Sequence, residues 1–116
     1  MHIYKRHRED VCVLDFVGSI LLQDGGDALQ EAVLASLREG WKKLVLNLGG
    51  VTHMDSSGLG HVVRCHALAQ AEGGLLKIAN ITKGVRNLLA ITKLVTVFDS
   101  YDGEDDAVRS FALSPA

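Results

Sequence analysis

The sequence predicts an α/β domain in which a mixed sheet of four to five strands, beginning with a β-hairpin, carries about four helices. Three observations support this fold class. Residues 3–8 and 11–18 are extended segments separated by the turn-like pair Glu9-Asp10, which favours a hairpin. After them, short apolar runs alternate with segments of helical periodicity. Such alternation is typical of parallel strands joined by crossover helices.

The strands are predicted from short apolar runs. The second hairpin segment, which ends at Gly18, is almost wholly apolar, so we expect it to lie inside the sheet. Residues 44–48 form another such run between turn signals and are predicted to be a central strand covered on both faces. Residues 75–79 and 95–98 complete the predicted sheet.

The helices are predicted from apolar spacing and from residues that begin or end a helix. Asp24 or Asp27 could cap the first helix, which ends at Gly40 in the left-handed conformation. The second helix begins near Ser56 and stops at Gly73-Gly74. The inward positions of the first three helices are Leu29, Ala32, Val33 and Leu37, then Leu59, Val62, Val63 and Ala69, then Val85, Leu88 and Leu89 after a Thr82 cap.

Two charged clusters have structural interpretations. The basic run at residues 5–8 is followed at once by Glu9 and Asp10, so we expect it to be a solvated strand face. The acidic cluster at 104–106 opens the terminal helix, which continues through Phe111. Carboxylates in a first turn oppose the partial positive charge of the free amides there.

Composition narrows the function. We expect residues 1–116 to form a single domain, because 47% apolar residues supply one core. A net charge of −2 argues against direct binding to nucleic acid or to anionic lipid. The N-terminus lacks a signal-peptide pattern, and no apolar run approaches the roughly 20 residues that span a bilayer, so we expect a cytoplasmic protein.

The two cysteines indicate neither a disulfide nor a metal site. Cys12 and Cys65 lie in apolar surroundings without paired spacing. His61 precedes Cys65 by one helical turn, but two ligands do not make a metal site, and we expect no metal or cofactor. We expect His66 to be a hydrogen-bonded core histidine, and Cys65 to be buried and inert.

The segment 51–60 joins the central strand to the second helix. Asp55 or Ser56 can cap that helix, and a cap is the plainest interpretation of such residues. The run Met-Asp-Ser-Ser-Gly-Leu-Gly at 54–60, after an apolar strand and before a helix that ends in Gly-Gly, resembles the signature of the STAS domain in bacterial anti-sigma factor antagonists. The resemblance extends over nearly the whole chain and implies the STAS fold.

The resemblance also implies a function. In that family the serine directly after the aspartate is phosphorylated, and Ser56 matches it. The unmodified antagonist binds an anti-sigma factor that often carries a serine-kinase domain of the GHKL ATPase type, and this releases a sigma factor. Phosphorylation abolishes the binding, and a serine phosphatase restores it. The resemblance leaves open which anti-sigma factor is the partner and whether the chain is a monomer or a weak dimer.

The expected partner surface is the turn into the second helix together with the outer face of that helix, where Leu68 also projects. A second candidate surface is the loop from Ser19 to Asp24. Family members commonly have Gly-Glu-Leu-Asp there, whereas this chain has Gly-Ser-Ile-Leu and an acidic residue only at Asp24. The partner-binding residues predicted are Asp24, Asp55, Ser56, Ser57, Gly58, Leu59, Gly60, His61 and Arg64.

Two other functions compete with this one. His53, Asp55 and Ser56 could suggest a hydrolase, but residues so close in sequence seldom form a triad, and the Gly-x-Ser-x-Gly motif is absent. We therefore expect no catalysis. A STAS domain that is never phosphorylated, and serves as a scaffold or as a ligand-sensing interaction module, is the stronger alternative, because a capping serine and a regulated serine look alike in sequence.

Overall fold

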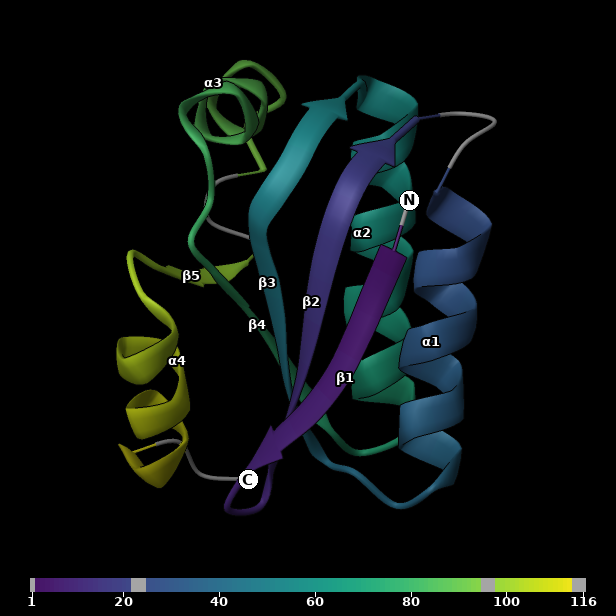
Figure 1. The fold of residues 1–116 in the computed structure, drawn as a ribbon, viewed down its shortest axis with the longest axis vertical. Coiled ribbons are helices and arrows are strands. Elements are labelled where there is room, and N and C mark those ends of the chain that lie inside the picture. Colours follow the sequence, from purple (N-terminus) through teal and green to yellow (C-terminus); the bar gives the residue numbers. More distant parts are fainter. Residues whose placement is uncertain (1, 22–24, 95–97, 114–116) are drawn as a thin grey trace.

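Five strands form one sheet in the order β1-β2-β3-β4-β5 (Figure 1). The computed structural model describes residues 2–21, 25–94 and 98–113. β1 runs antiparallel to β2, and the other neighbours are parallel. The mixed α/β fold with an N-terminal hairpin is therefore confirmed. The strands are β1 (His2–Arg8), β2 (Val11–Ile20), β3 (Lys43–Met54), β4 (Leu75–Ala79) and β5 (Asp99–Tyr101).

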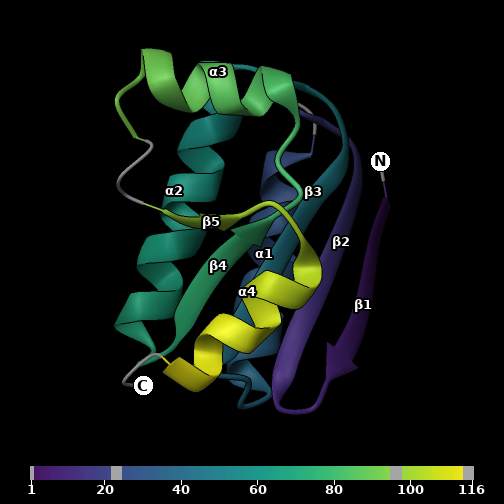
Figure 2. The ribbon, with the colours of Figure 1, turned by 90° about the vertical axis from the view of Figure 1, so that its left-hand side faces the viewer.

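Helices cover both faces of the sheet. Figure 1 shows α1 and α2 side by side on one face, and Figure 2 shows α4 on the opposite face, with α3 lying across the end at which β3 stops. None of the described helices is both long and apolar enough to cross a bilayer. The helices are α1 (Gly26–Arg38), α2 (Ser56–Ala71), α3 (Lys83–Ile91) and α4 (Glu104–Ser110), followed by a 3₁₀ turn at Phe111–Leu113.

Alternate side chains of β2 enter two different cores. Cys12, Leu14 and Phe16 pack in the large core beneath α1 and α2. Val11 and Val13 pack in a smaller core beneath α4. Because successive residues of a strand point to opposite faces, a strand covered on both sides must be apolar throughout. This confirms the prediction that the second hairpin segment lies inside the sheet.

Two strands are longer than predicted. β2 continues past Gly18 to Ile20, and β3 extends from Lys43 to Met54 rather than ending at residue 48. The pairing between them shifts register near Gly18. Its φ of 125° is a backbone conformation that glycine adopts readily and other residues adopt rarely. Gly18 thus accommodates a bulge instead of ending the strand. The extension carries both strands to the same end of the sheet, where α2 begins.

The first helix begins differently from the prediction. Gly25, with a φ of 93°, is its N-cap residue, and no side chain caps it. Asp27 lies in the first turn and does not act as the cap, while Asp24 lies outside the described residues. Gly40, with a φ of 104°, confirms the predicted left-handed stop.

The last strand also differs from the prediction. β5 covers Asp99–Tyr101 and pairs with β4, directly after the residues predicted as the last strand, 95–98. Residues 95–97 lie outside the described part, and Phe98 is buried in the large core without belonging to a strand. Thr82 caps α3 as predicted, because its hydroxyl accepts a hydrogen bond from the Val85 amide at 3.3 Å.

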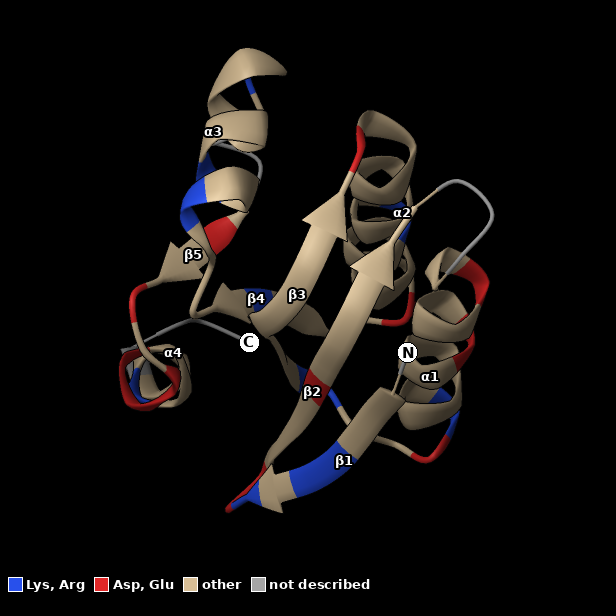
Figure 3. Ribbon diagram, turned by 45° about the horizontal axis from the view of Figure 1, so that its top comes forward, with Lys and Arg blue, Asp and Glu red and all other residues tan. Residues whose placement is uncertain are grey.

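The basic run of β1 is joined to α4 by ion pairs. Arg6 Nη2 donates to Asp15 Oδ1 at 2.9 Å, and Arg6 Nη1 donates to Glu104 Oε2 at 3.0 Å. Arg8 Nη1 donates to Glu104 at 3.0 Å and to Asp105 at 2.6 Å. The prediction of a solvated strand face is confirmed for Lys5, Arg6 and His7, which are exposed, while Arg8 is half-buried. The acidic first turn of α4 provides partners for both arginines (charges in Figure 3).

These ion pairs predict an acid-sensitive contribution to stability. Hydrogen bonds from Arg6 lower the pKa of Glu104 and that of Asp15. A carboxylate whose pKa is lower in the folded protein stabilises the fold above its unfolded pKa, about 4, and this contribution is lost as the pH falls through the folded value. We expect Glu104→Gln to lower the free energy of unfolding at pH 7 by about 1 kcal/mol.

Urea unfolding at pH 7 and below pH 3 measures this effect. The difference between wild type and Glu104→Gln should shrink toward zero at the lower pH. Glu31→Gln is the control, because Glu31 is an exposed carboxylate of α1 that makes no ion pair with a described residue. A Glu104→Gln difference of the same size at both pH values would contradict the assignment.

Candidate functional site

Ser56 is exposed at the first position of α2. β3 ends at Met54, and Asp55 is the N-cap residue, with its carboxylate Oδ1 accepting a hydrogen bond from the Gly58 amide at 2.7 Å. Of the two residues predicted as possible caps, Asp55 is therefore the one that caps. The hydroxyl of Ser56 makes no hydrogen bond with any described residue. The side chain of Ser56 is thus exposed to solvent and contributes no hydrogen bond to the described fold.

Gly58 lets the start of α2 press against the end of β2. A Cβ on Gly58 would lie 1.7 Å from the carbonyl oxygen of Ile20. Only glycine permits this approach. The next residue, Leu59, is 2% exposed and anchors the same turn in the large core. The close contact of Gly58 with β2 and the burial of Leu59 therefore fix the position of the turn that carries Ser56.

His61 lies against α1 rather than projecting outward. Its Nδ1 is 2.5 Å from Gln30 Nε2, and a Cβ on Gly26 would lie 2.2 Å from its Cδ2. The prediction that His61 projects from the outer face of α2 is wrong in this respect. Sequence reasoning missed Gly26 and Gln30, although the glycine pair 25–26 before the first helix was a signal of close packing.

Fewer residues are exposed on the outer face of α2 than predicted. Arg64 and Ser57 are exposed, as expected of partner-binding residues. Leu68, which was expected to project, is partly buried and packs against the large core. The prediction was wrong because Leu68 lies over the seam with α1, which the periodicity of α2 alone does not reveal.

The second candidate surface begins at the same end of the sheet. Ser19 and Ile20 pair with His53 and Met54 of β3, so the segment that leads into the loop lies beside the strand that leads to Ser56. Asp24 itself lies outside the described residues. The two surfaces singled out in the sequence thus begin on adjacent parallel strands.

The groups considered for catalysis and metal binding have other contacts. His53 is exposed, with Nδ1 3.3 Å from Thr52 Oγ1, and the Asp55 carboxylate binds the helix start. Cys65 is buried as predicted, and burial raises its pKa to about 12. His66 meets the ring of Phe98 edge-on at 5.5 Å and makes no hydrogen bond within the described residues.

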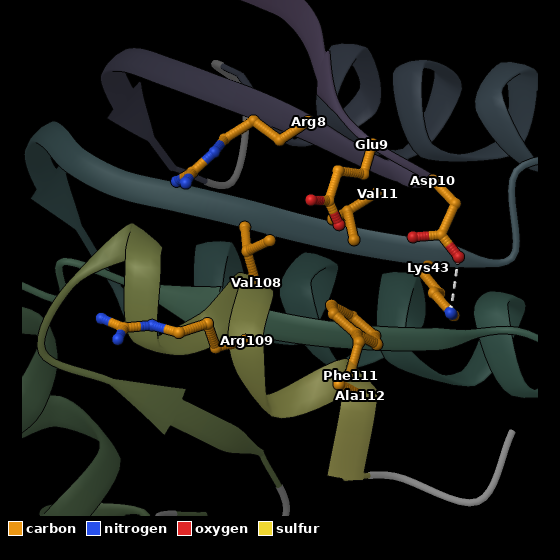
Figure 4. Close-up of a pocket in the computed structure, with 9 residues that line it drawn as sticks. All are labelled: Arg8, Glu9, Asp10, Val11, Lys43, Val108, Arg109, Phe111 and Ala112. Atoms are coloured by element: carbon orange, nitrogen blue, oxygen red, sulfur yellow. Dashed lines mark hydrogen bonds and ion pairs between the residues drawn. The ribbon is translucent and has the colours of Figure 1, made fainter.

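A separate pocket of about 250 Å³ lies between the β1–β2 hairpin and α4 (Figure 4). Arg8, Asp10, Lys43 and Arg109 reach its walls, and Phe111 provides apolar surface. Lys43 Nζ donates to Asp10 Oδ2 at 2.6 Å, and Arg8 is bound to the first turn of α4. Its charges are therefore largely satisfied internally, and the hairpin lies at the other end of the sheet from the start of α2.

Fold and site together define a class: a small α/β domain with an exposed serine where the central strand enters a helix. Comparison with known sequences agrees, because the STAS domain model matches residues 2–107. The chain belongs to the STAS domain family. It is 25% identical over 113 residues, 97% of either chain, to the anti-sigma F factor antagonist of Paenibacillus polymyxa.

Solved structures show the same fold. An anti-sigma factor antagonist from Mycobacterium paratuberculosis matches with a TM-score of 0.82 and 23% identity, over 94% of this chain and 92% of that one. The Bacillus cell fate determinant SpoIIAA, in its phosphorylated form, matches with a TM-score of 0.69 and 16% identity, over 95% and 99%. At these identities the likeness concerns the fold alone.

Proposed function

We propose that this protein is an anti-sigma factor antagonist with no catalytic activity, in which residues 1–116 act as one binding domain. Its unphosphorylated form binds an anti-sigma factor that carries a serine-kinase domain and so releases a sigma factor. Phosphorylation of Ser56 abolishes the binding, and a serine phosphatase reverses it. The family, the curated relative and the exposed position of Ser56 support this proposal.

The proposal rests on one observation: Asp55 caps α2, whereas the Ser56 hydroxyl makes no hydrogen bond with a described residue. Because Asp55 supplies the cap, the Ser56 hydroxyl can be modified without removing a bond that the fold uses. A phosphoryl group adds about −1.5 to −2 charges at neutral pH. The amides of the first helical turn that Asp55 leaves free favour an anion at this position, so the domain tolerates the charge.

At an interface the same charge acts differently. It must lose its water and meets the partner's own charges, and like charges in close contact cost several kcal/mol. A loss of about 3 kcal/mol already weakens binding more than a hundredfold. Modification can therefore separate the two proteins while each remains folded.

Incubation with ATP and the anti-sigma kinase of the same organism, followed by intact-mass measurement, tests the proposal. We expect wild type to gain the mass of one phosphate and Ser56→Ala to gain none. Thr52→Val is the control, since it removes an exposed hydroxyl on β3 that is not among the predicted partner-binding residues, and it should be modified like wild type. An unmodified wild-type protein would favour the alternative, a STAS scaffold or ligand-sensing module that is never phosphorylated.

A further inference from the structure

Two adjacent hollows lie along the outer side of α2. One, of about 320 Å³, is lined by Ser57, Gly60, His61 and Arg64. The other, of about 350 Å³, lies between α2 and α1 and shares Arg64 with the first. Both helices lie on the same face of the sheet (Figure 1). We call the combined surface the α2 groove; its remaining residues are Gln30, Ala67, Leu68 and Ala71.

Gly60 is a glycine that the fold does not require. Nothing lies within 4 Å of the position that its Cβ would occupy. A glycine inside a helix is less stable than alanine, so its presence weakens α2 without a gain in packing. Gly58, two residues earlier, is the opposite case, because a Cβ there would meet the backbone. The open space at Gly60 points to a neighbour outside this chain.

Gly60 belongs to a row of small exposed residues. Gly60, Ala67 and Ala71 are exposed and recur at the spacing of one helix face, with Arg64 between them. Small side chains let another backbone approach closely, and a shallow, largely apolar hollow beside them suits a helix. Leu68 supplies part of the floor of that hollow.

The charge of the α2 groove indicates the chemistry of its occupant. No acidic side chain lines either hollow, although the chain as a whole has a net charge of −2. Arg64 is exposed and makes no ion pair with any described residue. An arginine guanidinium pairs best with a carboxylate. The occupant should therefore carry an acidic residue opposite Arg64.

We propose that the α2 groove binds an amphipathic helix of the anti-sigma factor, with small or apolar side chains over Ala67 and Ala71 and a carboxylate on Arg64. This inference rests on the proposed function and specifies the partner's docking element. The groove begins at Ser57, the neighbour of Ser56. A phosphoryl group on Ser56 would therefore lie beside the surface that binds the acidic helix. Repulsion between the two negative charges would reinforce the switch.

Binding measurements with the purified kinase that modifies Ser56 test the proposal. We expect Gly60→Ala to melt at a higher temperature than wild type and yet to bind at least about tenfold more weakly. If Gly60 served only the fold, its replacement by alanine would not raise the melting temperature and weaken binding together. Gly84→Ala in α3 is the matched control, since its Cβ also meets nothing within 4 Å; it should melt higher and bind normally.

Arg64→Glu should weaken binding at least about a hundredfold, whereas Arg64→Lys should retain most of it. Arg64→Gln should bind with a smaller salt dependence than wild type. If Ser56→Asp blocks binding while the Gly60 and Arg64 variants bind like wild type, the groove assignment is wrong and the proposed function stands. If the unmodified wild type does not bind the kinase, both are wrong.

Cross-linking identifies the docking element directly. Ala71→Cys places a thiol among the exposed residues that line the groove, and the native thiols Cys12 and Cys65 are buried, so a photoreactive label attaches selectively. We expect the cross-linked kinase peptide to have helical amphipathic spacing and to contain Asp or Glu. A peptide with alternating strand-like spacing, a basic peptide, or no cross-link in a complex that still forms would overturn the proposal.

Discussion

Substitution of Gly58 by alanine should destabilise the protein more than any other single methyl group added to α2. The new Cβ would lie 1.7 Å from the Ile20 carbonyl oxygen and 2.6 Å from its carbon. Because these atoms belong to the backbone, no rotamer change relieves the clash, and α2 must move away from β2. We expect the free energy of unfolding to fall by about 3 kcal/mol or more.

Urea unfolding at neutral pH measures this loss against two comparisons. Asp55→Ala removes only the cap that binds the Gly58 amide, and should lower the free energy of unfolding by about 1 kcal/mol. Gly60→Ala adds the same methyl group two residues further on, in open space, and should not destabilise. A Gly58→Ala protein within about 1 kcal/mol of wild type would show that β2 and α2 are not in the close contact described here.

Replacement of Ser56 by aspartate should abolish partner binding while the domain stays folded. We expect affinity for the unmodified protein's anti-sigma partner to fall at least about a hundredfold, because a negative charge then occupies the start of the interface. Melting temperature should stay within a few degrees of wild type, since Ser56 is exposed and Asp55, not Ser56, caps the helix. Calorimetric titration and thermal melting measure the two quantities.

Two controls separate charge at this position from charge in general. Ser56→Ala should bind like wild type, because it removes a hydroxyl that makes no described hydrogen bond. Asn87→Asp adds the same charge on an exposed position of α3 and should also bind normally. Equal affinity for all three variants and wild type would end the phosphorylation-switch proposal, as would a loss of affinity shared by Asn87→Asp.

The order of helices and strands could be predicted from the sequence because each depends on local pattern. The apolar run of β2, the Gly40 stop and the Thr82 cap were all visible without a structure. The lengths of β2 and β3 could not be predicted, because they depend on pairing between two strands across a bulge at Gly18. A glycine that ends a strand and one that bends it look the same in sequence.

The site was predictable to a similar extent. The position of Ser56 at a helix start followed from the segment 51–60, and the structure adds that Asp55 is the cap. The placement of His61 could not be foreseen, because its neighbours Gly26 and Gln30 lie on another helix. Side chains at helical spacing indicate a shared face, but they do not tell whether a second helix already covers part of it.

The smaller core has a consequence for the order in which the chain is made. Val11, Val13 and Val45 are covered by Ala107 and Phe111, which are synthesised well after them. Arg6 finds its Glu104 partner only after 98 further peptide bonds have formed. On the ribosome, this strip of branched side chains stays in contact with water until α4 emerges. A nascent chain can therefore complete the second face of its sheet only once α4 has left the ribosome.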